Sequence, residues 1–279
     1  MKRIVLAFIA LSLGMATMAQ TDSTSKENAD TIKVGGVIII RKGGHHDSSN
    51  RKTISILNNK DNKDRKKNQK VSTNWFIVDL GFANYNENTN YSSAAAQSFA
   101  PGFTEEDLKL RTGKSVNVNF WFFMQRMSLI KKAVNLKYGL GLELNNYRFD
   151  NEQVRFEENP TRIILDPAYK GIEKNKLAAD YVTVPLMLNF NLTPGRKNGF
   201  GLSAGVSGGY LYSSRQKTKD NDDKDKLHDD FDLRKWKLAY IGELTLGPVR
   251  LYGSYAMKSM WEKGLDQTPY AVGLRLSHF

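Results

Sequence analysis

From Phe200 to Tyr212, every second residue is apolar apart from one glycine, and the residues between them are mostly glycine and serine. Successive side chains of a β-strand point to opposite faces, so the alternation predicts a strand with one apolar face and one nearly bare face. The same period recurs along the chain after residue 73. We predict eight strands, at residues 74–85, 115–125, 134–147, 180–192, 199–214, 234–246, 249–257 and 269–279.

The connections between these strands alternate strictly between longer and shorter ones. The longer connections are expected to include residues 86–113, 150–177 and 214–232, while "RMSLIKKA", "TPGRKN" and "GP" are tight turns. This alternation is typical of outer-membrane β-barrels, which have long extracellular loops and short periplasmic turns. The fold class we predict is all-β, an eight-stranded antiparallel up-and-down transmembrane β-barrel. An even number of strands places both ends of the barrel chain on the periplasmic side.

The apolar faces are predicted to point to lipid and the small-residue faces to the barrel interior. The interior of an eight-stranded barrel is only wide enough for side chains to fill it. Strands of ~9–11 residues, tilted by ~45°, cross the hydrocarbon layer, and closure satisfies every backbone group there. Aromatic residues near the strand ends fit the girdles at the two membrane interfaces. They are Trp75, Tyr85, Tyr210, Tyr212, Trp236 and Tyr270.

Charged residues of both signs fall on the predicted inward faces. Unpaired charges in a narrow interior would cost several kcal/mol each, so near-balance of sign predicts an ion-pair network that plugs the lumen. We expect this network to be structural rather than a transport route. Its members are Asp79, Lys137, Glu143, Lys237, Glu243, Arg250 and Arg275.

Two positions test the strand assignments. Pro185 lacks an N–H and lies within a predicted strand, so we expect a bulge or a local break in the ladder there. In the strand 115–125, the alternation places Val116, Val118, Phe120, Phe122 and Met124 together on the apolar face.

The chain begins with two basic residues, an apolar run from Ile4 to Leu13 and the small-residue site Thr17-Met18-Ala19. These features predict a secretory signal peptide over residues 1–19, because the apolar run is too short to span a bilayer. No later run of 18 apolar residues predicts a transmembrane helix. The chain has no cysteine, so an exported protein of this size cannot be a disulfide framework.

Residues 20–72 are predicted to form a mostly irregular periplasmic segment before the barrel domain at 73–279. The segment holds 12 Lys and Arg residues against 6 Asp and Glu residues. Two short strands, 34–42 and 52–57, are expected to form a hairpin or an added edge strand, and residues 58–70 form a charged linker. The basic excess suits an acidic lipid headgroup or an acidic periplasmic or cell-wall partner. Without interleaved aromatic residues, nucleic acid is not expected to be a partner.

Histidines offer the only candidate chemistry, and we expect no enzyme. His228 lies beside Asp229 and Asp230, and a His–Asp pair could activate water, but the surrounding acidic run is typical of a hydrated loop. His45 and His46 are adjacent, and adjacent side chains rarely aim at one metal ion. We predict no metal and no cofactor.

Residues 175–211 resemble the central segment of the PorT-like outer-membrane β-barrel proteins. The matching features are Lys176-Leu177, Tyr181, Pro185-Leu186 and the pair Gly201 and Gly205. The resemblance implies an outer-membrane barrel. One member of this family is an accessory of a protein-secretion system. It supplies no catalytic residue.

Three functions remain open from the sequence. The first is a non-enzymatic outer-membrane barrel that is surrounded by outer-membrane lipids. It has a narrow plugged lumen and a structural or interaction role. The second is porin-like transport or assistance to protein secretion, although an eight-stranded lumen argues against a wide pore. The third is a soluble lipocalin-like barrel that binds a ligand with its apolar face turned inward.

Overall fold

The computed structural model describes residues 29–34, 37–42, 70–194, 196, 199–220 and 223–276. The chain divides into two units, Met1–Asn68 and Gln69–Phe279. The predicted signal peptide over 1–19, the predicted strand 52–57, His45, His46 and most of the charged linker lie outside the described residues.

The first unit contains a two-stranded antiparallel hairpin. Its strands are β1 (Ala29–Val34) and β2 (Val37–Lys42), and Val34 pairs with Val37. The prediction of one strand over 34–42 was therefore wrong, and part of the segment expected to be irregular is a strand. Residues 35 and 36 are both glycine, a composition typical of two-residue hairpin connections.

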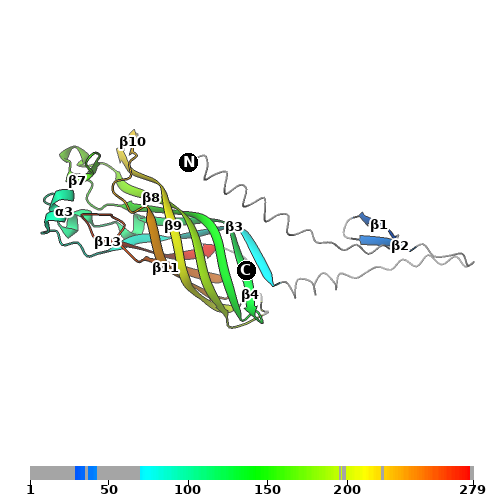
Figure 1. Ribbon diagram of the computed structural model, residues 1–279. Coiled ribbons are helices and arrows are strands. Elements are labelled where there is room, and N and C mark those ends of the chain that lie inside the picture. Colours follow the sequence, from blue (N-terminus) through cyan, green and yellow to red (C-terminus); the bar gives the residue numbers. More distant parts are fainter. Residues whose placement is uncertain are drawn as a thin grey trace, which may run out of the picture. The chain divides into compact units, whose positions relative to one another are not determined.

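The second unit is a closed barrel of eight strands, in agreement with the predicted fold class (Figure 1). Each barrel strand pairs antiparallel with the next barrel strand in the chain, including β8 with β9. The last strand, β13, pairs antiparallel with the first, β3, and this pairing completes the ring. The barrel strands are β3 (Val71–Glu87), β4 (Val116–Ile130), β5 (Val134–Arg148), β8 (Lys174–Asn191), β9 (Phe200–Asp220), β11 (Trp236–Leu246), β12 (Val249–Ala256) and β13 (Gln267–Leu276).

Long and short connections alternate as predicted, but the long ones contain structure of their own. They hold α3 (Ala94–Phe99), three short 3₁₀ helices, a hairpin of β6 (Val154–Glu157) with β7 (Arg162–Leu165), and the strand β10 (Asp223–Leu227). The predicted loop 214–232 is partly strand, because β9 continues to Asp220 and returns as β10. Figure 1 shows α3, β7 and β10 gathered at one end of the barrel.

Apolar side chains cover the outside of the barrel. Trp75, Leu238 and Leu276 are each 57–65% exposed, and the alternate residues of each strand face the interior. An exposed apolar surface this wide is out of place in water and suits hydrocarbon. Further members of this outward belt are Leu80, Phe82, Val184, Leu186, Leu188, Leu202, Val206, Tyr240, Val272 and Leu274.

Large inward side chains are accommodated by glycines on the neighbouring strand. Their registers pair Trp121 with Gly141, Met124 with Gly139, Met187 with Gly205, and Tyr252 with Gly273. A Cβ on Gly141 would lie 2.6 Å from the Trp121 ring, and one on Gly205 would lie 2.1 Å from the Leu186 carbonyl oxygen. The glycines on the nearly bare inward faces therefore leave the space that these large side chains fill.

Irregularities in the strand pairing show whether the predictions for Met124 and Pro185 were right. A register shift between Trp121 and Phe123 reverses the alternation, so Met124 is fully buried in the lumen and its predicted outward position was wrong. At Pro185, pairing with β9 is continuous, but pairing with β5 is interrupted between the pairs Tyr138–Leu186 and Gly141–Thr183. The predicted ladder break is thus present on one side of the strand, without a bulge.

Candidate functional site

Asp79 and Arg275 form the centre of the charged lumen. The carboxylate of Asp79 is fully buried and accepts two hydrogen bonds from Arg275, from Nε at 2.7 Å and from Nη2 at 2.7 Å. Trp121 Nε1 donates to the same carboxylate at 2.7 Å, and Asn119 donates at 3.3 Å. This bidentate geometry with extra donors is what a buried ion pair needs to offset its desolvation.

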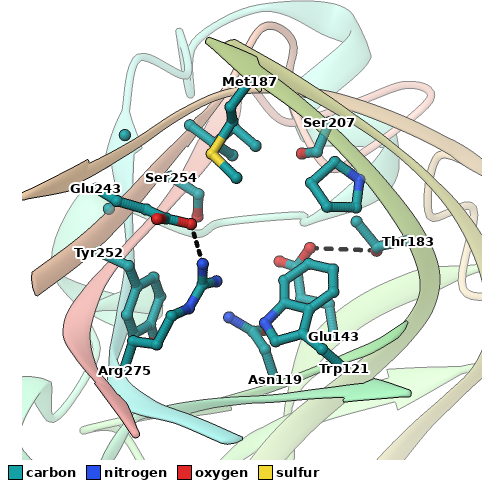
Figure 2. Close-up of a pocket in the computed structure, with 14 residues that line it drawn as sticks. Asn119, Trp121, Glu143, Thr183, Met187, Ser207, Glu243, Tyr252, Ser254 and Arg275 are labelled. Carbon is teal, nitrogen blue, oxygen red and sulfur yellow. Dashed lines mark hydrogen bonds and ion pairs between the residues drawn. The ribbon is translucent and has the colours of Figure 1, made fainter. Parts of the chain in front are cut away.

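The ion pairs continue across the barrel from Arg275. Its Nη1 pairs with Glu243 (Figure 2), Glu243 also pairs with Lys137, and a separate pair joins Lys237 to Glu143. All of these side chains are at least nine-tenths buried. We call the six residues the lumen network. They are Asp79, Lys137, Glu143, Lys237, Glu243 and Arg275.

The seventh predicted member, Arg250, lies on the inward face of β12 near the tight turn at Gly247 and Pro248, outside these ion pairs. Sequence reasoning also missed the polar neighbours of the network. Tyr252 donates its hydroxyl to Asn117, and Asn117 donates to Asn145 at 2.8 Å. The inward phase of the alternation was the available signal for these residues, because it places them on the same faces as the charges.

A small cavity lies among these side chains. A cavity of about 30 Å³ lies between Trp121, Glu143, Glu243 and Arg275, with Met187 and Pro185 also on its wall (Figure 2). That volume holds one or two water molecules. This cavity is therefore too small for a solute.

One end of the barrel is covered by what we call the cap, residues 88–115, 149–173, 223–235 and 257–266. Phe156 lies at its centre, fully buried, with ring centroids 5.2 Å from Phe231 and 6.0 Å from Trp261. Trp261 also contacts Phe99 edge-on at 5.4 Å. Each of the four long connections thus supplies an aromatic or aliphatic residue to one hydrophobic core.

The cap is tied to the barrel wall by polar contacts. Gln216 of β9 donates to the Val154 carbonyl at 2.8 Å and to Asn175 at 2.9 Å, and accepts from the Phe156 N–H at 3.0 Å. At the cap surface, a hydrogen bond from Arg155 and another from the Ala168 N–H lower the pKa of Asp166. His228 is exposed and follows Leu227, which packs against the cap core.

The comparisons with known proteins agree with this geometry. The family model for the outer membrane protein beta-barrel domain matches residues 67–256. The chain belongs to this family. A search of the curated proteins found no match.

Membership of the outer membrane protein beta-barrel domain family places the barrel in the outer membrane. The matched residues begin just before β3 and end with β12, so they include seven of the eight barrel strands. The lipocalin-like alternative is wrong, because it requires apolar side chains inside the barrel, and the lumen network occupies that space. Among the described residues, no helix is both long enough and apolar enough to cross a membrane.

Proposed function

We propose that this protein is a non-enzymatic outer-membrane barrel that passes no solute and serves a structural or interaction role. The observation that carries the proposal is the double closure of the barrel. Inside the membrane, the lumen network lines a cavity of about 30 Å³, too small for a solute. Above it, the Phe156 core joins all four long connections over the end of the barrel.

The absence of catalysis is part of the same proposal. The carboxylates of the lumen are held by Arg275, Lys137 and Lys237, so they are engaged in ion pairs rather than directed at a substrate site. Conductance in planar lipid bilayers tests the closed barrel directly. The purified protein is expected to give no steady channels at modest voltage, with a porin as the positive control. Reproducible open channels would favour the transport alternative.

We propose further that the cap faces the outside of the cell and the tight turns face the periplasm. Both ends of the barrel chain lie at the tight-turn end, because the number of strands is even. The basic segment 20–72 would then reach a periplasmic or cell-wall partner that carries acidic groups. The PorT-like resemblance over residues 175–211 makes a protein-secretion assembly one such setting.

A photo-crosslinking residue in place of Asn62, introduced into the full chain in cells, tests this orientation and partner together. The expected product is a crosslink to a periplasmic or cell-wall component. The same substitution at Lys131, in a tight turn of the barrel, is the control for contacts that the membrane location alone would produce. Labelling of an Asn62→Cys variant by a thiol reagent that cannot cross the outer membrane would overturn the orientation.

A further inference from the structure

Six lysines form two rows across neighbouring strands where β8, β9 and β10 extend beyond the apolar belt. In one row Lys174 pairs with Lys219, which pairs with Lys224. In the other row Lys176 pairs with Lys217, which pairs with Lys226. We call this set the lysine face. Residues directly opposite in an antiparallel ladder are ~5 Å apart and alternate residues ~7 Å, so the six cations share a small area.

The lysine face points away from the cap core. In β8 the intervening residues Asn175 and Leu177 are buried against the cap, and in β9 Gln216 is bound to it. Lys174 and Lys176 therefore share the outer face of β8 with Val182, which belongs to the outward apolar surface. The lysine face is thus a continuation of the membrane-facing surface, beyond the point where apolar side chains end.

Like charges directly opposite each other destabilise a sheet, so this arrangement requires counter-charge. The protein provides some of it. Lys219 pairs with Glu173, Lys176 donates to Asn146 at 2.7 Å, and Arg215, one rung nearer the membrane, pairs with Asp180 at 2.6 Å. Burial, followed by the charges of Lys174 and Lys217, still lowers the pKa of Lys176 to about 8.

We propose that the lysine face binds the phosphate groups of phosphorylated lipid headgroups in the leaflet around the cap end of the barrel. Two features identify this occupant. The cations face sideways into the zone directly beyond the apolar belt, where headgroups lie, and lysine ammonium groups are effective point-charge partners for phosphate. The rows stand five to eight residues beyond Val182 and Tyr212 along β8 and β9, which favours a phosphorylated head that projects from the hydrocarbon surface. The proposal does not depend on whether the barrel conducts solutes.

Native mass spectrometry of the detergent-solubilised full chain with diphosphorylated lipid A tests the proposal. The variant K176Q/K217Q/K219Q should bind this lipid at least tenfold more weakly, because each lysine near an anionic surface contributes about fivefold. The control K109Q/K114Q/K263Q removes the same number of charges from exposed positions elsewhere in the cap. It should bind like the parent chain. The heat-modifiable gel shift shows whether each variant folds.

Further binding measurements distinguish a lipid headgroup from soluble phosphate as the source of the bound phosphate group. Dephosphorylated lipid A and a zwitterionic phospholipid should bind weakly to the parent chain, and free inorganic pyrophosphate at the same concentration should not displace the lipid. Unchanged binding by the folded lysine variant, or an equal loss in the control, would overturn the proposal. Effective competition by pyrophosphate would show a site for soluble phosphate instead of a lipid headgroup.

Discussion

The lumen and the cap bury opposite kinds of side chain within one chain. The lumen is centred on the buried ions Asp79 and Arg275, while the cap is centred on Phe156 and Trp261. The difference follows from what surrounds each region. Around the lumen the solvent is hydrocarbon, which takes the apolar side chains outward, whereas the cap is exposed to water and collects its apolar side chains inside. The same hydrophobic effect therefore produces a polar interior in the barrel and an apolar interior in the cap at its end.

The largest effect is expected where lumen packing leaves no space. A side chain at Gly273 would place its Cβ 2.2 Å from the Leu80 carbonyl oxygen, a backbone atom that cannot move away. Gly273→Val is therefore expected to prevent closure between β13 and β3, and the heat-modifiable band in detergent gels should be lost. Gly253→Val is the matched control, because its Cβ faces outward and meets only the Ala271 carbonyl oxygen at 3.7 Å. Equal folding of the two variants would contradict the tight lumen.

Breaking the central ion pair should have the next largest effect. Asp79→Ala leaves Arg275 short of its bidentate partner in a buried site, which should lower the free energy of unfolding by about 3–5 kcal/mol. Urea unfolding in lipid micelles measures this change. The double variant Asp79→Ala/Arg275→Met removes both charges, and Glu243 keeps its pair with Lys137. Part of the stability should return, and a double variant less stable than the single one would argue against a coupled pair.

A substitution in the apolar interior should loosen the cap and leave the barrel closed. Phe156→Ala removes the ring at the centre of the cap core, at a local cost of about 3 kcal/mol. Hydrogen exchange should rise in residues 88–115 and 257–266, while the heat-modifiable shift of the barrel persists. Phe76→Ala is the control, because Phe76 is 69% exposed on the outward face. Loss of the barrel shift in Phe156→Ala would show that the two interiors unfold together.

The smallest effect concerns the cap surface and pH. Because its hydrogen bonds lower the pKa of Asp166, this carboxylate stabilises the cap above its unfolded pKa, and the contribution is lost as the pH falls through the lower folded value. Acidification should therefore raise proteolysis of the cap, with part of that increase absent in Asp166→Asn. The lumen, which is closed to solvent, should keep its barrel shift over the same range. An identical pH response in Asp166→Asn would exclude Asp166 as its source.

The barrel was predictable because alternation with a period of two is a local signal. The strand pattern around Phe200–Tyr212 is repeated in all eight strands, and it placed Asp79 and Arg275 inside although 196 positions separate them. Which charges pair is not local information, since it depends on register around the closed ring. Met124 was misplaced because a bulge changes the phase of the alternation without any mark in composition.

The cap was not predicted because its residues carry no period. Phe156, Phe231 and Trp261 come from three different connections, each surrounded by polar residues, and only their meeting in space makes a core. The lysine face shows the same limit. Lysines at alternate positions in β8, β9 and β10 are visible in the sequence, but they become neighbours only through the register of the sheet.

The pairing of large inward side chains with glycines on the next strand has a consequence for how this barrel can change over evolutionary time. Trp121 fits because the opposite residue, Gly141, has no side chain, and Met187 fits for the same reason opposite Gly205. A larger side chain at one of the paired positions is tolerated only after the side chain at the other has become smaller, so substitutions at the two positions must be coupled. Hybrids that exchange a single strand with a relative should fail to mature, whereas exchanges that carry both members of a pair, such as the whole β4–β5 or β8–β9 hairpin, should succeed.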